Sequence, residues 1–179
     1  MSFSLIPDRV FSRYTDITPE FLTAEGIALL LCDLDYTLAP RSVARPDVVL
    51  RAWLKDCRQA GVRVMILSNN RSTERVETFC SELGIPYVGH AGKPSRRGYQ
   101  EAMALANVPP EETAMLGDKL LTDVLGAKRS GIRALMVEPL NGPVGKWNHV
   151  LHFLQRPFKF ISKRRYRKHE QIRKNRGKA

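Results

Sequence analysis

Four short segments of this chain carry carboxylate, hydroxyl, amide or lysine groups, and each of them follows an apolar run. In chain order they are Asp33-Leu34-Asp35-Tyr36-Thr37, Ser68-Asn69-Asn70, Lys93-Pro94, and Gly117-Asp118 with Asp123 five residues further on. A carboxylate can attack phosphorus, move a proton or bind Mg²⁺, and hydroxyl, amide and ammonium groups can hold phosphoryl oxygens. The four segments together predict a magnesium-dependent phosphoryl-transfer site built on an aspartate nucleophile.

Taken singly, each segment has a simpler interpretation. Asp33 and Asp35 could form an acidic turn after a strand, and Ser68 could cap a helix. Asp123 could be a favourable charge at the start of a helix, and Lys93 could be an ordinary surface lysine. The order of the segments and their shared position after apolar runs favour one joint site.

The apolar pattern predicts strands that alternate with helices around these segments. Continuous apolar runs are typical of buried strands, and apolar positions spaced by three and four residues are typical of helices that cover one face. The predicted strands span residues 27–32, 62–67, 85–88, 113–116 and 132–137. The predicted helices span residues 18–26, 46–61, 72–83 and 121–130, with a further helix after Lys93, and residues 1–17 are expected to be extended.

This alternation predicts a parallel sheet with helices on its faces. Ligands bind such sheets at the edge where the strands end. All four polar segments fall at or just beyond strand ends, so we expect them to meet at that edge.

Charge is distributed unevenly along the chain. The net charge is +11, but residues 1–155 hold 18 bases and 17 acids, so the excess lies in the remaining tail. We divide the chain into a domain at 1–143 and an appendage at 144–179.

The appendage is expected to begin with an amphipathic helix. One stripe of this helix carries Trp147, Val150, Leu151 and Leu154. We expect Pro157 to end the helix, because proline interrupts helices, and residues 158–179 to be loosely ordered alone.

Cysteine usage and hydropathy point to a reducing compartment. Cys32, Cys57 and Cys80 each lie within an apolar pattern, which favours core packing over a disulfide or a zinc site. The longest apolar run, Ile27–Cys32, is far shorter than the roughly 20 residues of a membrane span. The N-terminus lacks the order of a signal peptide. We expect a cytoplasmic location, with any membrane contact made peripherally from the inner face.

The pattern of the four segments resembles the haloacid dehalogenase (HAD) superfamily of phosphatases. The matching residues are Asp33-x-Asp35-x-Thr37, Ser68, Lys93 and Gly117-Asp118-x-x-x-x-Asp123. The fuller segments are similar to the YqeG-type subfamily IIIA phosphatases, which are in turn similar to mitochondrial phosphatidylglycerophosphate phosphatases. The likeness runs from about Leu5 to Pro139 and leaves the basic tail outside. It implies a Rossmann-like, three-layer α/β fold with a parallel central sheet.

The resemblance also implies a role for each matching residue. Asp33 would be the nucleophile and Asp35 the general acid/base, and an aspartate at position 35 favours phosphatase over dehalogenase chemistry. The implied ligands of Mg²⁺ are Asp33, Asp118 and the backbone carbonyl of Asp35. The groups that would bind or position phosphate are Thr37, Ser68, Asn69 and Lys93. Asp123 would support the site, either in the outer shell of the metal or by orienting Lys93.

No large cap domain fits into this chain. Only 30 residues separate Thr37 from Ser68, and 22 separate Asn70 from Lys93. The predicted helices and strands fill both intervals. The site should therefore be open, which suits a large or surface-bound substrate or a site covered by a neighbouring subunit.

The open site, the tail and the resemblance make phosphatidylglycerophosphate the favoured substrate. The tail interleaves aromatic and basic residues, which suits peripheral contact with an anionic membrane. One alternative is a soluble sugar or nucleotide phosphatase covered by an oligomer. A second is an RNA- or ribosome-binding protein with a residual phosphatase site, whose tail would bind nucleic acid phosphates. The tail could also be simply solvated, with its apolar stripe packed on the body.

Overall fold

The computed structural model describes residues 4–70, 73–142 and 146–176. Its strands are β1 (Arg9–Phe11), β2 (Leu29–Cys32), β3 (Arg63–Leu67), β4 (Tyr87–Val88), β5 (Thr113–Gly117) and β6 (Arg133–Val137). Its α-helices are α1 (Pro19–Ala24), α2 (Val48–Gln59), α3 (Thr73–Leu83), α4 (Arg96–Ala106), α5 (Leu125–Ser130) and α6 (Lys146–Arg176). Short helical turns form η1 (Tyr14–Asp16), η2 (Pro110–Glu112) and η3 (Leu120–Val124), the last of them a π-helical turn.

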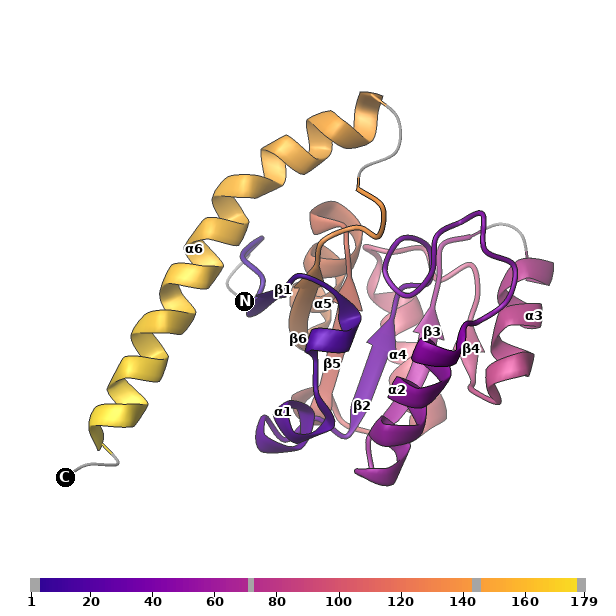
Figure 1. Ribbon diagram of the computed structural model, residues 1–179, viewed down its shortest axis with the longest axis horizontal. Helices are drawn as coiled ribbons and strands as arrows, with labels where there is room; N and C mark the ends of the chain where they lie inside the picture. The colour runs from indigo at the N-terminus through magenta and orange to yellow at the C-terminus, as the bar shows by residue number, and fades with distance from the viewer. Residues whose placement is uncertain (1–3, 71–72, 143–145, 177–179) are drawn as a thin grey trace.

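The six strands form one sheet in the order β1-β6-β5-β2-β3-β4, and every neighbouring pair is parallel (Figure 1). All the strands therefore end at the same edge. Strand β2 lies at the centre, between β5 and β3. Residues that follow β2, β3 and β5 in the sequence are thus brought together at the carboxyl edge, as the alternation of strands and helices predicts.

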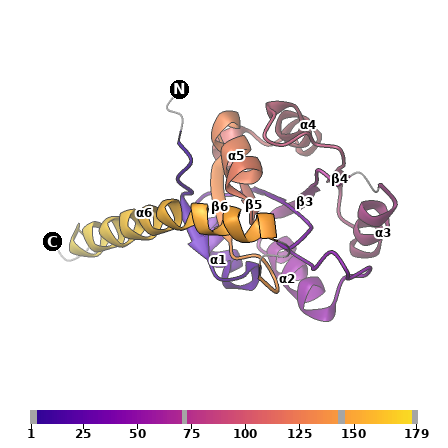
Figure 2. The ribbon, with the colours of Figure 1, turned by 90° about the horizontal axis from the view of Figure 1, so that it is seen from above.

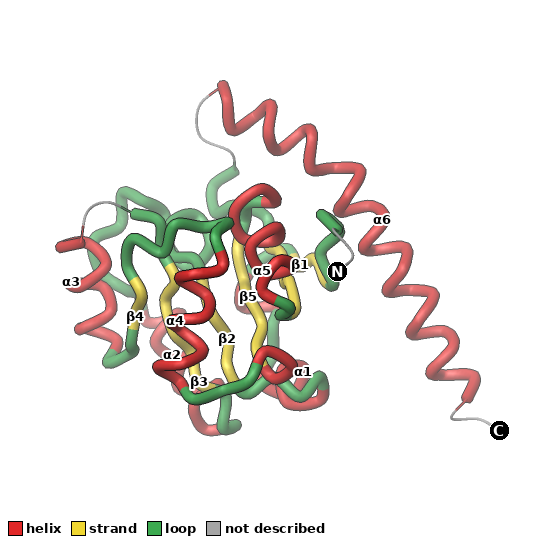
Figure 3. The backbone as a smooth tube through the Cα atoms, turned by 180° about the vertical axis from the view of Figure 1, so that it is seen from behind, coloured by secondary structure: helices red, strands yellow, loops and turns green. Residues whose placement is uncertain are grey.

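Helices cover both faces of the sheet, which gives three layers. Seen from above, α1, α2 and α3 lie on one side of the strands, and α4 and α5 lie on the other (Figure 2). From behind, α4 and α5 stand in front of the sheet (Figure 3). Strand β2 shows why both faces need cover: Leu30 and Cys32 enter one core, and Leu29 and Leu31 enter the other.

The predicted three-layer α/β fold with a parallel sheet is confirmed. Between Thr37 and Ser68 the structure has only α2, β3 and their connecting loops, so no cap domain is inserted there. The three cysteines are free and buried, as predicted. Helix α2 begins two residues later than expected, because the carboxylate of Asp47 accepts the backbone N–H of Leu50 at 2.8 Å and caps it.

Helix α6 is continuous through Pro157, so the prediction that Pro157 ends the helix is wrong. The prediction of loose order from residue 158 is wrong as far as Arg176, where the helix ends. A proline inside a helix removes one N–H donor and crowds the carbonyl four residues earlier, at a cost of about 3 kcal/mol. Pro157 is exposed, so the carbonyl of Phe153 can bond to water instead. The helical bonds on either side then continue.

Helix α6 lies beside β1 at the end of the sheet, as Figures 1 and 2 show from two directions. The guanidinium of Arg9 in β1 stacks 3.3 Å from the ring centroid of Tyr166. Phe158 packs against the core of the α4–α5 face. Glu138, just after β6, accepts from Nζ of Lys159 at 2.5 Å and pairs with Nε2 of His152 at 2.9 Å. These contacts fix the helix to the body.

In the part of the chain that the structure describes, none of the helices combines the length and the apolar character needed to cross a membrane.

Candidate active site

Asp33 occupies the centre of the carboxyl edge. It directly follows β2, and its backbone N–H donates to the carbonyl of Leu116 in β5 at 2.8 Å. Its Oδ1 accepts a hydrogen bond from Nζ of Lys93 at 2.6 Å. Its Oδ2 is buried and has no hydrogen-bond partner among the described residues. One carboxylate oxygen is therefore held in place, and the other is available to a ligand.

The ammonium of Lys93 lies between two carboxylates. Nζ is 2.6 Å from Oδ1 of Asp33 and 2.7 Å from Oδ1 of Asp123, and the lysine side chain is only 2% exposed. Burial alone would lower the pKa of Lys93, but the charges of Asp123 and Asp33 outweigh it and raise the pKa above its usual value. The lysine is therefore a fixed positive charge next to Asp33.

Asn69 holds the backbone of Lys93 rather than pointing at Asp33. Its Nδ2 donates to the carbonyl of Lys93 at 2.9 Å, and its Oδ1 accepts the N–H of Lys93 at 2.8 Å. Ser68 ends the neighbouring strand and accepts the N–H of Asn70 on its hydroxyl at 3.0 Å. Their predicted roles in phosphate binding stay predictions, and Asn69 has a second, structural contact that the sequence did not indicate.

Asp118 completes the cluster from the end of β5. Its Oδ1 accepts from the hydroxyl of Thr37 at 3.5 Å and lies 3.5 Å from Nζ of Lys119. Burial raises the pKa of Asp118 to about 7, against the opposing charge of Lys119. A buried carboxyl with a raised pKa is one that a cation would stabilise in its ionised form.

Asp123 fits against the backbone of Gly117 so closely that no other residue could replace this glycine without movement. A Cβ atom at position 117 would come within 2.3 Å of the carboxylate of Asp123. The Oδ2 of Asp123 also accepts the N–H of Lys119 at 3.0 Å. These two contacts aim Oδ1 at Lys93, which agrees with the orienting role predicted as one of two alternatives for Asp123.

The residues present fit a hard divalent cation. Asp33, Asp118 and Asp123 are buried, and each offers one carboxylate oxygen within 4.8 Å of the others. Oδ1 of Asp123 is ion-paired with Lys93 and its Oδ2 accepts the N–H of Lys119, whereas Oδ2 of Asp33 has neither an ion pair nor a hydrogen bond among the described residues. Asp33 and Asp118 would therefore be the carboxylate ligands, in keeping with the preference of Mg²⁺ for a few carboxylates completed by water and phosphate oxygens.

The carboxylate of Asp35 lies apart from this cluster, in a second set of contacts. Its Oδ1 pairs with Arg75 of α3 at 3.1 Å, and its Oδ2 accepts from Nδ2 of Asn70 at 3.1 Å. Arg75 also donates to the carbonyls of Val43 and Pro40, in the loop that follows Asp35. The guanidinium therefore holds both the carboxylate and its loop. The metal contact predicted for Asp35 involves its backbone carbonyl and stays a prediction.

Sequence reasoning did not identify Arg75. An arginine in the first turns of a helix is common, and nothing in its spacing separates it from a solvated charge. The available signal was its position, five residues after Asn70 on the helix that leaves the β3 motif. A helix that starts at a ligand-binding edge keeps its first turn within reach of the site.

The loop after Asp35 is tied to the segment that anchors α6. The backbone carbonyl of Tyr36 accepts the N–H of Leu140 at 2.8 Å. Tyr36 itself has a φ of 66°, in the left-handed region that non-glycine residues rarely occupy. Two residues before Leu140, Glu138 holds Lys159 and His152 of α6.

The arrangement has the parts needed for transfer of a phosphoryl group to a carboxylate. The side chains of Asp33, Lys93, Asp118, Asp123 and Thr37 are brought into one buried cluster. A half-buried carboxylate, Asp35, lies two residues from the candidate nucleophile, where it could exchange a proton with a leaving group. The roles assigned to the individual residues remain predictions.

Comparisons with known proteins agree with this geometry. The sequence profile of haloacid dehalogenase-like hydrolases matches residues 11–131. Over 137 residues the chain is 34% identical to the Bacillus subtilis protein named Probable phosphatase YqeG, which covers 75% of this chain and 78% of that protein. It is also 31% identical over 127 residues to the Chlamydomonas reinhardtii protein named Phosphatidylglycerophosphate phosphatase 1, chloroplastic. That match covers 66% of this chain and 47% of the relative.

A solved structure shares the fold. The cobalt-bound form of deoxy-D-mannose-octulosonate 8-phosphate phosphatase from Haemophilus influenzae aligns with a TM-score of 0.52 at 16% identity. The alignment covers 77% of this chain and 92% of that structure. At this identity the likeness concerns the arrangement of the sheet and helices alone.

Proposed function

The chain belongs to the haloacid dehalogenase-like hydrolases and is a phosphatase, and on that premise we propose that it hydrolyses phosphomonoesters through an aspartyl-phosphate on Asp33, with Mg²⁺ as cofactor. The observation that carries this proposal is that the two carboxylate oxygens of Asp33 have different surroundings. One oxygen is held by Lys93 at 2.6 Å, and the other is buried without a hydrogen-bond partner among the described residues. A carboxylate so placed can act on an incoming phosphoryl group.

In the first half-reaction, an oxygen of Asp33 forms a bond to phosphorus while the bond between phosphorus and the leaving oxygen breaks. Asp35 gives a proton to that oxygen, so the product leaves as an alcohol. The ammonium of Lys93 balances the negative charge beside Asp33 throughout. When bound by Asp33 and Asp118, Mg²⁺ would supply further positive charge for the phosphoryl oxygens.

In the second half-reaction, water attacks phosphorus and the bond to Asp33 breaks, which releases inorganic phosphate. Asp35, now ionised, takes a proton from that water. Arg75 and Asn70 both bond to the carboxylate of Asp35, so they fix its position. Transfer of the proton to the leaving group requires Asp35 to be protonated, and the contact with Arg75 must then weaken.

For the substrate we propose phosphatidylglycerophosphate, which is converted to phosphatidylglycerol, at an anionic membrane surface contacted by the tail. The support is threefold. A relative with 31% identity is named for this substrate. Between Thr37 and Ser68 no cap encloses the site. A pocket of about 540 Å³, lined in part by Leu38, Val49 and Leu140, lies beside the loop after Asp35, where it could receive the part of a large substrate that extends beyond the catalytic residues, none of which lines it.

The test is Mg²⁺-dependent phosphate release from vesicles that carry phosphatidylglycerophosphate, beside a panel of soluble sugar and nucleotide phosphates. Asp33→Asn should abolish turnover, by on the order of 10⁴-fold or more, because it removes the nucleophile while keeping its shape. Its folding should be checked by circular dichroism. Substantial residual activity of this variant would refute the role of Asp33. Preference for a soluble ester would keep the mechanism and discard the lipid.

A further inference from the structure

The described part of α6 buries polar side chains beside Phe158 and turns most of its large apolar side chains outward. The buried residues of the helix are Gln155, Lys159 and Ser162, at 8%, 5% and 2% exposure. The exposed large apolar residues are Val150, Phe153, Leu154, Phe160 and Ile161, at 49%, 65%, 57%, 67% and 39%. A helix that only packed on the body would present the opposite stripe to the core.

The outward stripe is a continuous surface. Positions 150, 153, 154, 157, 160 and 161 are separated by three residues or one, so they lie on one side of the helix over about three turns. These six residues are called the outer stripe below. Five of the nine exposed large apolar residues among the described part of the chain belong to it. Such a concentration on one face of a protein usually marks a surface that contacts another molecule.

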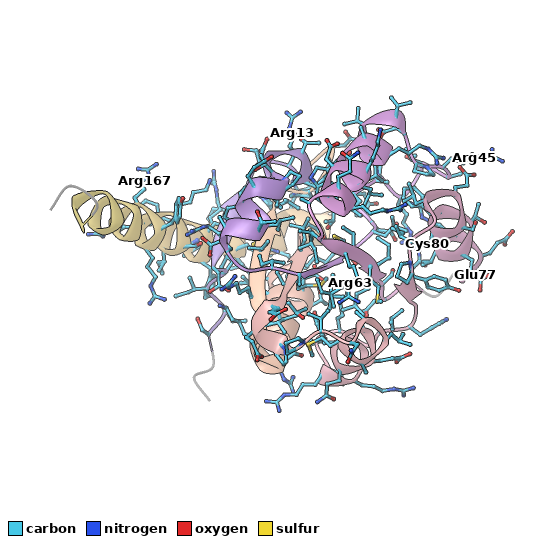
Figure 4. All side chains as sticks on the ribbon, turned by 90° about the horizontal axis from the view of Figure 1, so that it is seen from below. Arg13, Arg45, Arg63, Glu77, Cys80 and Arg167 are labelled. Carbon is cyan, nitrogen blue, oxygen red and sulfur yellow. The ribbon has the colours of Figure 1, made fainter. Side chains whose placement is uncertain are left out.

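Basic side chains flank and extend the outer stripe. Exposed bases follow at Arg156, Lys163, Arg164, Arg165 and Arg167. No acidic residue occurs between His149 and Arg167. Figure 4 shows the side chain of Arg167 projecting away from the body of the protein. The surface therefore combines an apolar centre with an uncompensated positive charge.

We propose that α6 lies flat on an anionic lipid bilayer, with the outer stripe in the interface and the exposed bases against the lipid headgroups. An interfacial helix of this kind has aromatic and aliphatic residues on one side and lysine and arginine around them. Each base near an anionic surface favours binding, and the apolar side chains leave water. This inference extends the proposed lipid substrate, but it concerns binding and stands apart from turnover.

Two other occupants fit the outer stripe less well. A nucleic acid would use the bases and stack on the phenylalanines, but it gains little from Val150, Leu154 and Ile161. A second copy of α6 would cover the stripe but would bring two rows of bases together without acids between them. A bilayer with anionic headgroups matches both the apolar centre and the charge.

The proposed contact also suits the position of the site. Helix α6 begins near the end of the molecule to which the β2 arrow points, and this end holds the carboxyl edge of the sheet (Figure 1). The outer stripe occupies the first half of the helix, nearest that edge. The outer stripe therefore lies on the part of α6 that is nearest the edge with the candidate site.

The experiment is flotation of the full chain with vesicles of phosphatidylcholine, with and without phosphatidylglycerol, in the absence of substrate. The double variant Phe153→Gln/Phe160→Gln should lower the partition coefficient on the mixed vesicles by at least about tenfold, because two aromatic side chains no longer enter the interface. The matched control is Leu105→Gln, which changes a 66% exposed apolar residue on α4 and should bind like the wild type.

A second pair of variants tests the charges. Arg164→Gln/Arg167→Gln should weaken binding to the mixed vesicles by about fivefold for each charge and should leave binding to phosphatidylcholine alone nearly unchanged. All variants should keep the circular dichroism spectrum and the turnover of a small aryl phosphate. If the wild type binds the vesicles but does not hydrolyse phosphatidylglycerophosphate, the proposed substrate is wrong, and the proposed binding of α6 to the bilayer is unaffected.

Three outcomes would overturn the proposal. One is equal binding of wild type and the phenylalanine variant to mixed vesicles. Another is salt-sensitive binding to a single-stranded RNA with no partition into vesicles. The third is a wild-type protein that sediments as a dimer and does not bind vesicles, together with a phenylalanine variant that sediments as a monomer.

Discussion

The carboxyl edge of the sheet and the inner side of α6 both bury polar groups, but they treat them differently. At the edge, the buried ammonium of Lys93 has two buried carboxylate partners, and Gly117 and the N–H of Lys119 fix one of these. Under α6, Oε1 of Gln155 and Oγ of Ser162 are buried with no hydrogen-bond partner among the described residues. Lys159 pairs with Glu138, which is itself 38% exposed.

The difference separates two reasons for burying a polar side chain. At the edge, the buried charge of Lys93 is matched by two carboxylates, which holds these side chains in one geometry, and the buried Oδ2 of Asp33, without a hydrogen-bond partner among the described residues, is left to a ligand, as a reaction site requires. The buried polar groups under α6 are paired only in part, which lowers the stability of the folded protein. The helix keeps this orientation when another interaction favours it. Binding of the exposed apolar stripe of α6 to a membrane would be that interaction.

The largest effect expected from this comparison is on proton transfer. Asp35→Asn should slow hydrolysis of alkyl phosphates by about 10²–10⁴-fold, because these leaving groups need a proton, and should slow an activated aryl phosphate much less. Arg75→Ala should show the same preference to a smaller degree, because it frees the carboxylate and its loop. The measurement is kcat for both substrate types. An equal loss on both would contradict the role of Asp35, and rescue by Arg75→Lys would support positioning by charge.

The two buried lysines give the next largest contrast. Lys93→Met leaves Asp33 and Asp123 buried without a counter-charge and should lower the free energy of unfolding by about 3–5 kcal/mol without metal. Lys159→Met should cost at most about 1 kcal/mol, because its partner Glu138 is partly solvated, at 38% exposure. Urea unfolding of both variants makes the comparison. Similar losses of unfolding free energy for the two variants would mean that the ion pairs of Lys93 stabilise the protein no more than the ion pair between Lys159 and Glu138.

Replacement of two glycines tests how tightly the edge is packed. Gly117→Ala places a Cβ against the carboxylate of Asp123 and should cost about 1–3 kcal/mol of stability and reduce kcat, because Asp123 must move away from Lys93. Gly89→Ala is the control, since a Cβ there meets only the ring of Tyr87 at 3.7 Å. Thermal unfolding and turnover of both variants give the result. A wild-type rate in Gly117→Ala would show that Lys93 holds its place without Asp123.

The smallest effect concerns the pH dependence of the α6 contact. Burial tends to raise the pKa of Glu138, but hydrogen bonds from Lys159 and His152 dominate and lower it. The group therefore stabilises the folded protein above the pKa of an unfolded glutamate, about 4.3, and this stabilisation is lost as the pH falls through the lower folded value. Glu138→Gln should reduce hydrogen-exchange protection in α6 at pH 7. The difference in protection between variant and wild type should disappear on acidification. A difference that persists at low pH would contradict the role of Glu138 in holding α6.

Much of the edge could be predicted from the sequence because a parallel sheet gathers strand ends by topology alone. Asp33, Lys93 and Asp118 each follow a strand, so their meeting needed only the correct order of strands and helices. The contact of Asp35 with Arg75 could not be predicted in this way, since it joins residues 40 positions apart and depends on the path of a loop and the placement of α3.

The orientation of α6 could not be predicted either. An apolar stripe on a helix next to a domain normally faces the core, and one of the alternatives stated above therefore had Val150 and Leu154 packed on the body. Both are exposed, so that alternative is wrong for these two residues. The side chain of Trp147 lies outside the described residues. The rule that proline ends a helix failed at Pro157, where one backbone hydrogen bond is lost and the residue is exposed, so that water can bond to the carbonyl of Phe153 instead.

The sheet order has a consequence for oligomerisation. A strand at the end of a sheet offers unpaired backbone groups to which another chain can add, and proteins limit this by keeping such strands short or covering them. Here β4 has two residues and β1 has three, and α6 lies beside β1. A chain cut at residue 157 would lose Tyr166 and Lys159 and uncover β1. We expect edge-to-edge association of copies through β1 from the truncation itself, whatever the helix does on a membrane.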